Sequence, residues 1–178
     1  MVIGFEFVMA LLALLVVGSF TRSGIKSIPP YQEAVYLRMG KFVRVLGPGT
    51  NFVAPWVNKL IKFDKRIQSL DIPRQEILLE DNRSVYVNAT VFIRIVDTRS
   101  VFMDVEDYCV ATVDSAKTAI CSVIGHMGLE DILSNRLEIN SRLSLILDEF
   151  TKKWGVAVEK AAIREVFFAF KVTDPVDA

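Results

Sequence analysis

Histidine and cysteine, from which many catalytic and metal sites are built, are scarce in this sequence. Its 178 residues include one histidine, His126, and two cysteines, Cys109 and Cys121. No cluster of histidine, cysteine and acidic residues has the spacing of metal ligands. A lone histidine near a helix end is more often a cap or a surface residue than a catalyst. We therefore expect a protein that is not an enzyme and uses no metal or cofactor.

Other catalytic signatures are missing too. Residues 47–50, Gly-Pro-Gly-Thr, lack the Lys-Ser/Thr pair of a phosphate-binding loop. Asp148 and Glu149 are neighbours in a predicted helix, so their carboxylates point in different directions and make a poor acid–base pair. Nor is there an excess of basic residues, because 21 basic residues balance 21 acidic ones. This balance argues against a nucleic acid as partner.

The two cysteines fall in one predicted helix. They are twelve residues apart, which at the helical rise separates them by about 18 Å, too far for a disulfide. We interpret both as small buried thiols in a reducing compartment.

Apolar residues, by contrast, are concentrated at the N-terminus. From Val2 to Phe20 the only charged residue is Glu6. A helix of this length just spans the hydrocarbon core of a bilayer, which is about 30 Å thick. A cleaved signal peptide would need a basic start and a small-residue cleavage site, and a core helix would need a partner for its whole surface. We predict a transmembrane anchor over residues 1–21, with these membrane-contact candidates: Phe7, Leu11, Leu14, Val17 and Phe20.

Basic residues follow this apolar stretch and none precedes it. They are Arg22, Lys26, Arg38, Lys41 and Arg44. The positive-inside rule then predicts a single-pass protein of the cell membrane, with its N-terminus outside and the following domain in the cytoplasm. Residues 22–30 are expected to be a juxtamembrane linker, stiffened by two consecutive prolines at its end.

Alternating apolar and polar residues predict strands over much of residues 33–96. The expected strands cover 33–39 and 42–46, parts of 59–72 up to Pro73, then 76–79 and 85–96, and together they predict one antiparallel meander. Residues 51–61 are apolar but interrupted by Pro55, and they fit either the core or a contact with the near leaflet through Phe52 and Trp56. The core interpretation is favoured because apolar loop residues usually pack on their own domain.

The periodicity becomes helical after the predicted sheet. A helix is predicted over 108–127, ending near Gly125, and a short helical turn over 129–133. A second long helix starts at Ser134 or Asn135 and runs to Lys153, with Leu143, Leu147, Phe150 and Trp154 on one apolar stripe. Residues 156–168 alternate again and predict a strand that returns to the sheet.

Several motifs lie in order over residues 28–166. They are IPPYQEAVYLRMGK (28–41), GPGTNFVAP (47–55), FDKRIQSLDIPRQE (63–76), SVIG (122–125), LEDILSNRLEIN (129–140) and WGVAV (154–158). Together they resemble the stomatin/prohibitin/flotillin (SPFH, band 7) superfamily, and within it the prokaryotic stomatin-like branch, the slipins.

The resemblance implies an α+β fold, in which a transmembrane helix precedes an SPFH/band 7 domain made of an antiparallel meander, two longer helices and a returning strand. The expected divisions are an anchor (1–21), a linker (22–30), the SPFH domain (31–168) and a short tail (169–178).

In function, the resemblance implies a scaffold that contacts the lipid bilayer, forms a homo-oligomer through its SPFH domain and organises membrane microdomains. It also implies possible partners: an NfeD-type membrane protein, a membrane protease or a channel. The alternative is an adaptor that regulates a protease or channel without forming a ring. The family brings no catalytic residues.

Two segments differ from the family pattern. After the last strand the family has a long helix rich in alanine and charged residues, whereas residues 167–178, FFAFKVTDPVDA, show no heptad. From this sequence we expect oligomers through the domain alone, weaker than a closed ring. Residues 79–84, LEDNRS, replace the family's usual Thr-Lys-Asp-Asn-Val and reverse a charge that could lie in a subunit contact.

Overall fold

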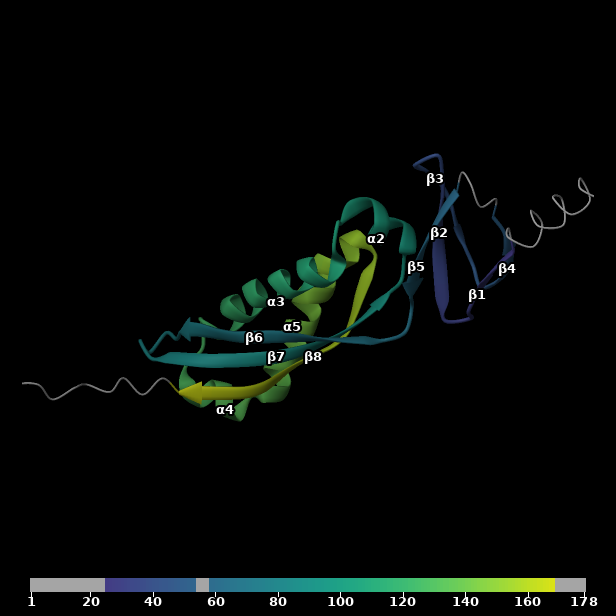
Figure 1. Ribbon diagram of the computed structural model, residues 1–178. Coiled ribbons are helices and arrows are strands. Elements are labelled where there is room, and N and C mark those ends of the chain that lie inside the picture. Colours follow the sequence, from purple (N-terminus) through teal and green to yellow (C-terminus); the bar gives the residue numbers. More distant parts are fainter. Residues whose placement is uncertain (1–24, 54–57, 169–178) are drawn as a thin grey trace, which may run out of the picture. The chain divides into compact units, whose positions relative to one another are not determined.

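The computed structural model describes residues 25–53 and 58–168, and the chain forms two compact units (Figure 1). Unit 1 extends to Lys65, and unit 2 begins at Arg66. In the described residues no helix combines the length and the apolar character that crossing a bilayer requires. The predicted anchor, residues 1–21, lies outside the described residues.

The described part of unit 1 consists of five short strands in two antiparallel sheets. The strands are β1 (Ile25–Ile28), β2 (Gln32–Arg38), β3 (Lys41–Leu46), β4 (Gly49–Phe52) and β5 (Asn58–Asp64). β1 pairs with β4, and the other sheet has the order β3-β2-β5. A small core of Ile28, Ala34, Leu46 and Val53 joins these elements, with Tyr36 and Leu60 packed against it.

Unit 2 is a three-stranded antiparallel sheet covered by helices. Its elements are β6 (Gln68–Leu78), β7 (Ser84–Ile95), α2 (Thr98–Asp104), α3 (Tyr108–Ile124), α4 (Leu129–Ser134), α5 (Arg136–Thr151), the 3-10 turn η1 (Lys152–Trp154) and β8 (Val156–Phe168). The strand order is β6-β7-β8, so the long, β-branched β7 lies in the centre.

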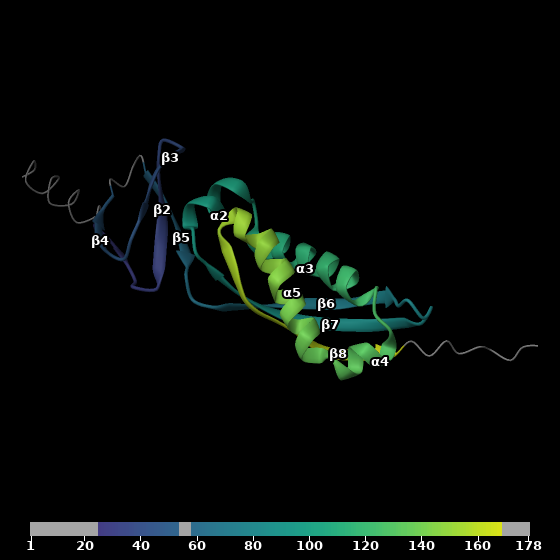
Figure 2. The same ribbon diagram turned by 180° about the vertical axis from the view of Figure 1, so that it is seen from behind.

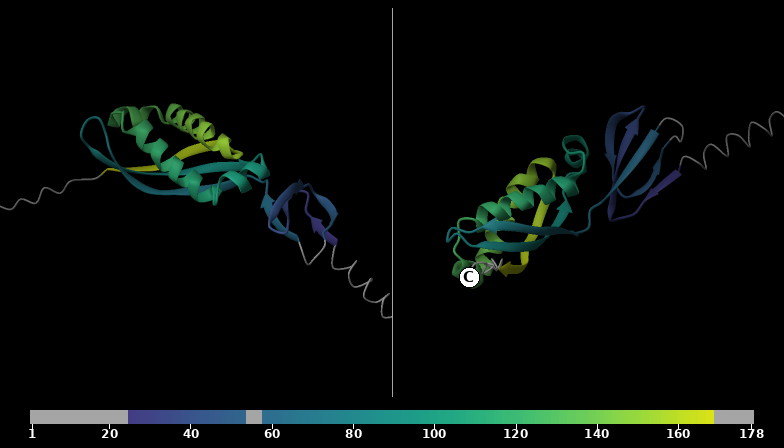
Figure 3. Two further views of the ribbon diagram at one scale, coloured as in Figure 1. Left: turned by 90° about the horizontal axis from the view of Figure 1, so that it is seen from above. Right: turned by 60° about the vertical axis from the view of Figure 1, so that its left-hand side comes forward.

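The helices α3 and α5 lie on the same face of this sheet (Figures 2 and 3). Alternate residues of β7 from Val85 to Ile95 are buried, as period-two alternation requires for a sheet with one covered face. They share the core with buried residues of the helices: Ala116, Ala119, Ile120 and Ile124 of α3, and Ile139, Leu143 and Leu147 of α5.

Three polar side chains of α5 bind the backbone of the edge strand β8. Asn140 Oδ1 accepts a hydrogen bond from the amide of Ile163 (3.0 Å), and Ser144 Oγ accepts one from the amide of Ala161 (2.8 Å). Asp148 Oδ1 accepts the third, from the amide of Val158 (3.1 Å). Residues four apart lie on one helical face, so this acceptor row follows the strand and satisfies amides that an edge strand otherwise leaves open.

The other edge strand, β6, is interrupted at its middle. Pro73 lies inside it, and the pairing with β7 shifts between Ile72 and Gln75. The Gln75 side-chain amide donates to the carbonyls of Pro73 (3.3 Å) and Arg74 (3.1 Å). Proline and bulges are devices that keep an edge strand from pairing with another chain.

Gly155 connects α5 and η1 to β8 through a conformation that favours glycine. Its φ is +77°, and an added Cβ would lie 2.5 Å from the carbonyl oxygen of Asp97. Its own carbonyl accepts hydrogen bonds from the amides of Val96 (2.9 Å) and Asp97 (3.1 Å). The prediction that the second long helix runs to Lys153 is confirmed, because η1 continues α5 to Trp154.

The helices α3, α4 and α5 and the long strands β7 and β8 were predictable from sequence. The predictions are confirmed by these elements: β7 for 85–96, α3 for 108–127, α4 for 129–133, α5 with η1 for the second long helix, and β8 for 156–168. The α+β class is confirmed as well.

Three details of the predicted fold are wrong. The strands before residue 96 form three sheets, not one meander, because alternation predicts strands but not their pairing. Pro73 does not end a strand but lies within β6, which an edge strand tolerates. Phe150 is 43% exposed, since the buried stripe of α5 passes through Leu147 and Thr151.

Three elements were not foreseen. β1 lies within the stretch interpreted as a linker, and β4 lies between the predicted strands 42–46 and 59–72. α2 lies in a stretch for which no element was predicted. Asp97 starts α2 as its N-cap, accepting from the amide of Arg99 at 3.0 Å.

We predict that Ser144→Ala lowers the free energy of unfolding by about 1–3 kcal/mol, because it leaves the buried amide of Ala161 without an acceptor. Ser141→Ala is the matched control. Both hydroxyls donate back within α5, Ser144 to the carbonyl of Asn140 and Ser141 to that of Leu137, but Ser141 accepts no hydrogen bond from a described strand. The control should change stability by less than about 0.5 kcal/mol. Urea unfolding followed by circular dichroism measures both, and equal losses would contradict a role for the acceptor row.

Candidate functional site

The residues predicted to contact the membrane fall outside the described structure. This holds for Phe7, Leu11, Leu14, Val17, Phe20 and Trp56. Phe52 belongs to β4, but its side chain is outside the described set as well. These seven residues therefore remain predictions.

Charge is divided unevenly between the two units, although the whole chain is neutral. The described part of unit 1 has two acidic residues, Glu33 and Asp64, against seven basic ones: Lys26, Arg38, Lys41, Arg44, Lys59, Lys62 and Lys65. Residues 66–168 of unit 2 have 16 acidic and 12 basic residues. A strong positive excess in one part of a chain is typical of a surface that binds a polyanion or an anionic membrane.

The face of the unit 2 sheet opposite α3 and α5 is lined with paired polar groups. Arg94 bonds to Glu159 (2.6 Å), and Arg164 lies 3.9 Å from Asp71. The Asn88 side chain exchanges two hydrogen bonds with Glu165.

One end of this face is apolar and aromatic. The Arg74 guanidinium lies 4.3 Å from the centroid of the Phe167 ring, a distance typical of cation–π contact. Phe167 is paired across the sheet with Tyr86. Leu78 (59% exposed) lies on the same part of the sheet. This end, Leu78, Tyr86 and Phe167, is a candidate contact surface for another protein, and we call it the aromatic end.

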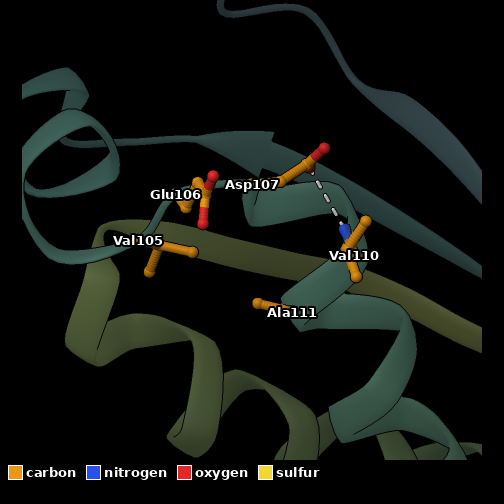
Figure 4. A pocket seen from close by; sticks show the side chains of 5 residues that line it. All are labelled: Val105, Glu106, Asp107, Val110 and Ala111. Carbon is orange, nitrogen blue, oxygen red and sulfur yellow. Dashed lines mark hydrogen bonds between the residues drawn. The ribbon is translucent and has the colours of Figure 1, made fainter.

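A hollow of about 530 Å³ lies at the start of α3 and is lined by Val105, Glu106, Asp107, Val110 and Ala111 (Figure 4). Asp107 is the N-cap of α3, and its Oδ1 accepts from the amides of Cys109 (2.9 Å) and Val110 (3.2 Å). Its carboxylate is thus engaged in holding the helix. Glu106, the other acidic residue of the lining, makes no hydrogen bond or ion pair through its side chain among the described residues, so the hollow combines apolar side chains with one unpaired negative charge.

Asp97 caps α2 in the same manner, and its surroundings perturb its titration. Burial raises the pKa of Asp97, but hydrogen bonds from the Ser100 hydroxyl (2.9 Å) and from the amides of Arg99 and Ser100 outweigh burial, so the pKa lies below its ordinary value. This is the behaviour of a structural cap, which stabilises the ionised carboxylate.

The two thiols differ from the prediction that both are buried. Cys109 is half-buried and Cys121 is exposed, both as free thiols on α3. Burial raises the pKa of Cys109, and although the Tyr108 side chain lowers it, the nearby Asp107 carboxylate raises it further. Cys121 faces solvent because the buried positions of α3 are its neighbours Ile120 and Ile124.

His126 is exposed just beyond α3, as expected of a surface residue. Among the described residues there is no group of three histidine, cysteine, aspartate or glutamate side chains that could hold a metal ion. The acceptor row of α5 was missed from sequence. Its signal, polar residues at positions 140, 144 and 148 beside an apolar stripe, is shared by many solvent-exposed helix faces.

Residues 26–178 match the family model described as SPFH domain / Band 7 family. The chain is 37% identical over 166 residues to a stomatin homolog of Pyrococcus abyssi, an alignment that covers 93% of the chain and 62% of that protein. It is 38% identical to a stomatin homolog of Pyrococcus horikoshii, with 90% of the chain and 60% of that protein covered. It is 35% identical to Stomatin-1 of Caenorhabditis elegans, with 80% and 43% covered. The chain thus spans about 60% of the length of these archaeal relatives.

We predict that the two thiols react at different rates with a disulfide reagent such as Ellman's reagent. Cys121, in a Cys109→Ser variant, should react faster near neutral pH, because it is exposed. Cys109, in a Cys121→Ser variant, should react slowly until the pH is raised, because only the thiolate reacts. Absorbance stopped-flow across pH measures both, and equal rates after unfolding are the control. A faster reaction of Cys109 would contradict the raised pKa.

Proposed function

Because the chain belongs to the SPFH domain / Band 7 family, we propose that it is a stomatin-like scaffold associated with a membrane. Unit 1 meets the bilayer, and unit 2 presents surfaces to neighbouring proteins. The observation that supports this division most is the separation of charge, with a strong basic excess in unit 1 and an acidic excess in unit 2. An anionic membrane surface attracts the first and repels the second.

We further propose that residues 1–21 anchor the chain as a single membrane-spanning helix. The length of the apolar run and the basic residues that follow it support this, and they put the described units in the cytoplasm. A membrane-spanning helix inserts in effect irreversibly, so in this proposal the basic residues of unit 1 determine how that unit meets the bilayer rather than whether the chain stays there.

Self-association through unit 2 is the second part of the proposal. Both edges of its sheet are protected from pairing with another chain. The acceptor row of α5 protects β8, and Pro73 with the irregular pairing protects β6. Neighbours therefore meet through faces rather than by extending the sheet. The aromatic end offers exposed apolar area next to charged groups, a composition that favours protein contacts.

The molecules organised by this scaffold are proposed to be membrane proteins: an NfeD-type protein, a protease or a channel, within membrane microdomains. The chain itself is proposed to have no catalytic activity. The alternative function is an adaptor that binds one such protein without self-assembly, and the acidic, apolar hollow at the start of α3 favours it, because a basic peptide segment fits that composition.

Membrane attachment and orientation can be tested in cells with the thiol of Cys121 as a reporter. We expect the full chain to stay in the membrane fraction after an alkaline carbonate wash. A membrane-impermeant maleimide should label Cys121 only after the cells are opened, because the thiol is exposed on a cytoplasmic unit. A Cys121→Ser variant is the control for specific labelling. Extraction of the chain by carbonate would contradict the proposed anchor. Labelling of Cys121 in intact cells would show that the orientation is opposite to the one proposed.

Self-association can be tested by mass in a mild detergent at micromolar concentration. We expect a species heavier than one chain, which is lost in a Leu78→Glu/Phe167→Glu variant because a buried charge in the contact is costly. Leu137→Glu is the control, since Leu137 is 84% exposed on α5, outside the aromatic end. A strict monomer leaves the adaptor as the function, and crosslinking in native membranes should then give one discrete heterologous partner.

A further inference from the structure

The tip of the β2–β3 hairpin holds a methionine in a backbone conformation that favours other residues. Arg38 pairs with Lys41, so the loop consists of Met39 and Gly40 alone, with φ of 52° and 78°. Two positive φ angles in succession are typical of a type I′ turn, for which Asn-Gly is the preferred sequence. Methionine lacks the side chain that makes asparagine tolerant of this region. The turn itself would therefore be better served by another residue.

The Met39 side chain also adds nothing to the core. It is 78% exposed, the highest exposure among the large apolar side chains described in unit 1. Val43, on the neighbouring strand, is 48% exposed and is the extra residue where the β2–β3 pairing shifts. An apolar side chain that is both exposed and conformationally disfavoured points to a contact outside the described structure.

Cations surround this methionine. Arg38 and Lys41 flank it in sequence and are paired across the hairpin. Arg38 also pairs with Asn58 on β5, which brings the following residue, Lys59, to the same end of the sheet. All three side chains are exposed, and none of them has an ion-pair partner among the described residues.

The two acidic residues in the described part of unit 1 lie at the opposite end of the same sheet. Asp64 pairs with Gln32 at the start of β2, and Glu33 follows Gln32 in the same strand. Glu33 binds Lys65 at 2.7 Å, so the carboxylates share their end with a cation. β2 spans seven residues, and at the rise of a strand this separates the two ends by about 20 Å.

We propose that residues 38–41, the cationic tip, dock on anionic lipid headgroups, with Met39 reaching past the phosphates and Arg38, Lys41 and Lys59 binding them. The inference rests on the proposed membrane association and names the lipid chemistry that unit 1 selects. A membrane offers negative charge directly beside hydrocarbon, which matches an apolar tip ringed by cations. The acidic unit 2 of a second copy offers charge as well, and it is the rival occupant.

The methyl groups of the methionines report this contact in the full chain. The chain has five methionines, and Met103, 56% exposed on α2 of unit 2, is an internal control. The protein is labelled with ¹³C at the methionine methyls and placed in nanodiscs of phosphatidylcholine, alone or with an equal part of phosphatidylglycerol. A Met39→Leu variant assigns the signal. Traces of a nitroxide-labelled lipid then broaden methyls that approach the bilayer.

We expect the Met39 methyl to broaden several-fold more than the Met103 methyl, and only in discs that contain phosphatidylglycerol. Raising salt from about 0.1 M to about 1 M shortens the Debye length from about 10 Å to about 3 Å and should remove most of the difference. Equal broadening of both methyls in chains that stay on the discs overturns the tip contact but not membrane association. Chains that leave the discs overturn both.

Variants distinguish a lipid contact of Met39 from a role of Met39 in the fold and from a contact with a second copy of the chain. Arg38→Gln/Lys41→Gln should abolish the extra broadening of Met39, whereas Lys152→Gln/Lys153→Gln, the same charge change on unit 2, should leave it intact. Met39→Asn should raise the melting temperature, because asparagine suits the turn, and a lower one would contradict the argument that the fold does not need Met39. If a second copy occupies the tip, Met39 broadens no more than Met103 and the aggregate mass falls with salt, which also overturns the proposal.

Discussion

Three hydrogen bonds from the outer amides of β8 to side chains of α5 fix the relation between the last helix and the last strand of unit 2. The strand follows the helix directly, so the chain must reverse within a few residues and still bring acceptors opposite donors. Gly155 makes the reversal possible, since its backbone conformation and its close approach to Asp97 leave no room for a side chain. The carbonyl of Gly155 then ties the end of β7 to the same corner.

The irregular pairing of β8 belongs to the same arrangement. One shift in the β7–β8 register leaves Glu159 as an extra residue between Val158 and Lys160. Without it, the amides of Val158 and Ala161 would face opposite sides of the strand, because amide direction alternates along a regular strand. The bulge lets both amides reach the one row of acceptors on α5.

What the sequence predicted well were the elements whose periodicity is long and uninterrupted. β7 has a clean alternation of β-branched residues, and α3 has apolar residues at helical spacing over four turns, so local pattern and tertiary burial agree. β1 is four residues long and follows no such pattern. α2 is short and starts at an aspartate cap that resembles any polar turn. Strand pairing was the hardest feature to predict from the sequence, because alternation does not show which strands are neighbours. Pro73, for example, is typical of a strand end, but the edge strand β6 tolerates it.

The site was harder to foresee than the fold. The zero net charge is a property of the whole chain and does not exclude a basic unit within it. The division at Lys65 shows that two units of opposite charge are joined in one chain. The prediction that both cysteines lie on one helix is correct. Their exposure depends on which face of α3 meets the sheet, and an error of one or two residues in the position of that face changes the result. Membrane contacts predicted from hydrophobicity fall on residues outside the described structure, whereas Met39 draws attention through its backbone angle, which no composition reveals.

Sheet edges that are protected from pairing have a consequence for the membrane-attached scaffold proposed above. Chains tethered to a membrane share a thin layer, and their local concentration there far exceeds that in the surrounding solution. Crowding of this kind drives exposed strands to pair edge to edge and then to convert into insoluble fibres. With three amides of β8 bonded to α5 and the pairing of β6 interrupted at Pro73, copies of unit 2 can be packed densely without fusing their sheets, so the proposed assembly can be remodelled.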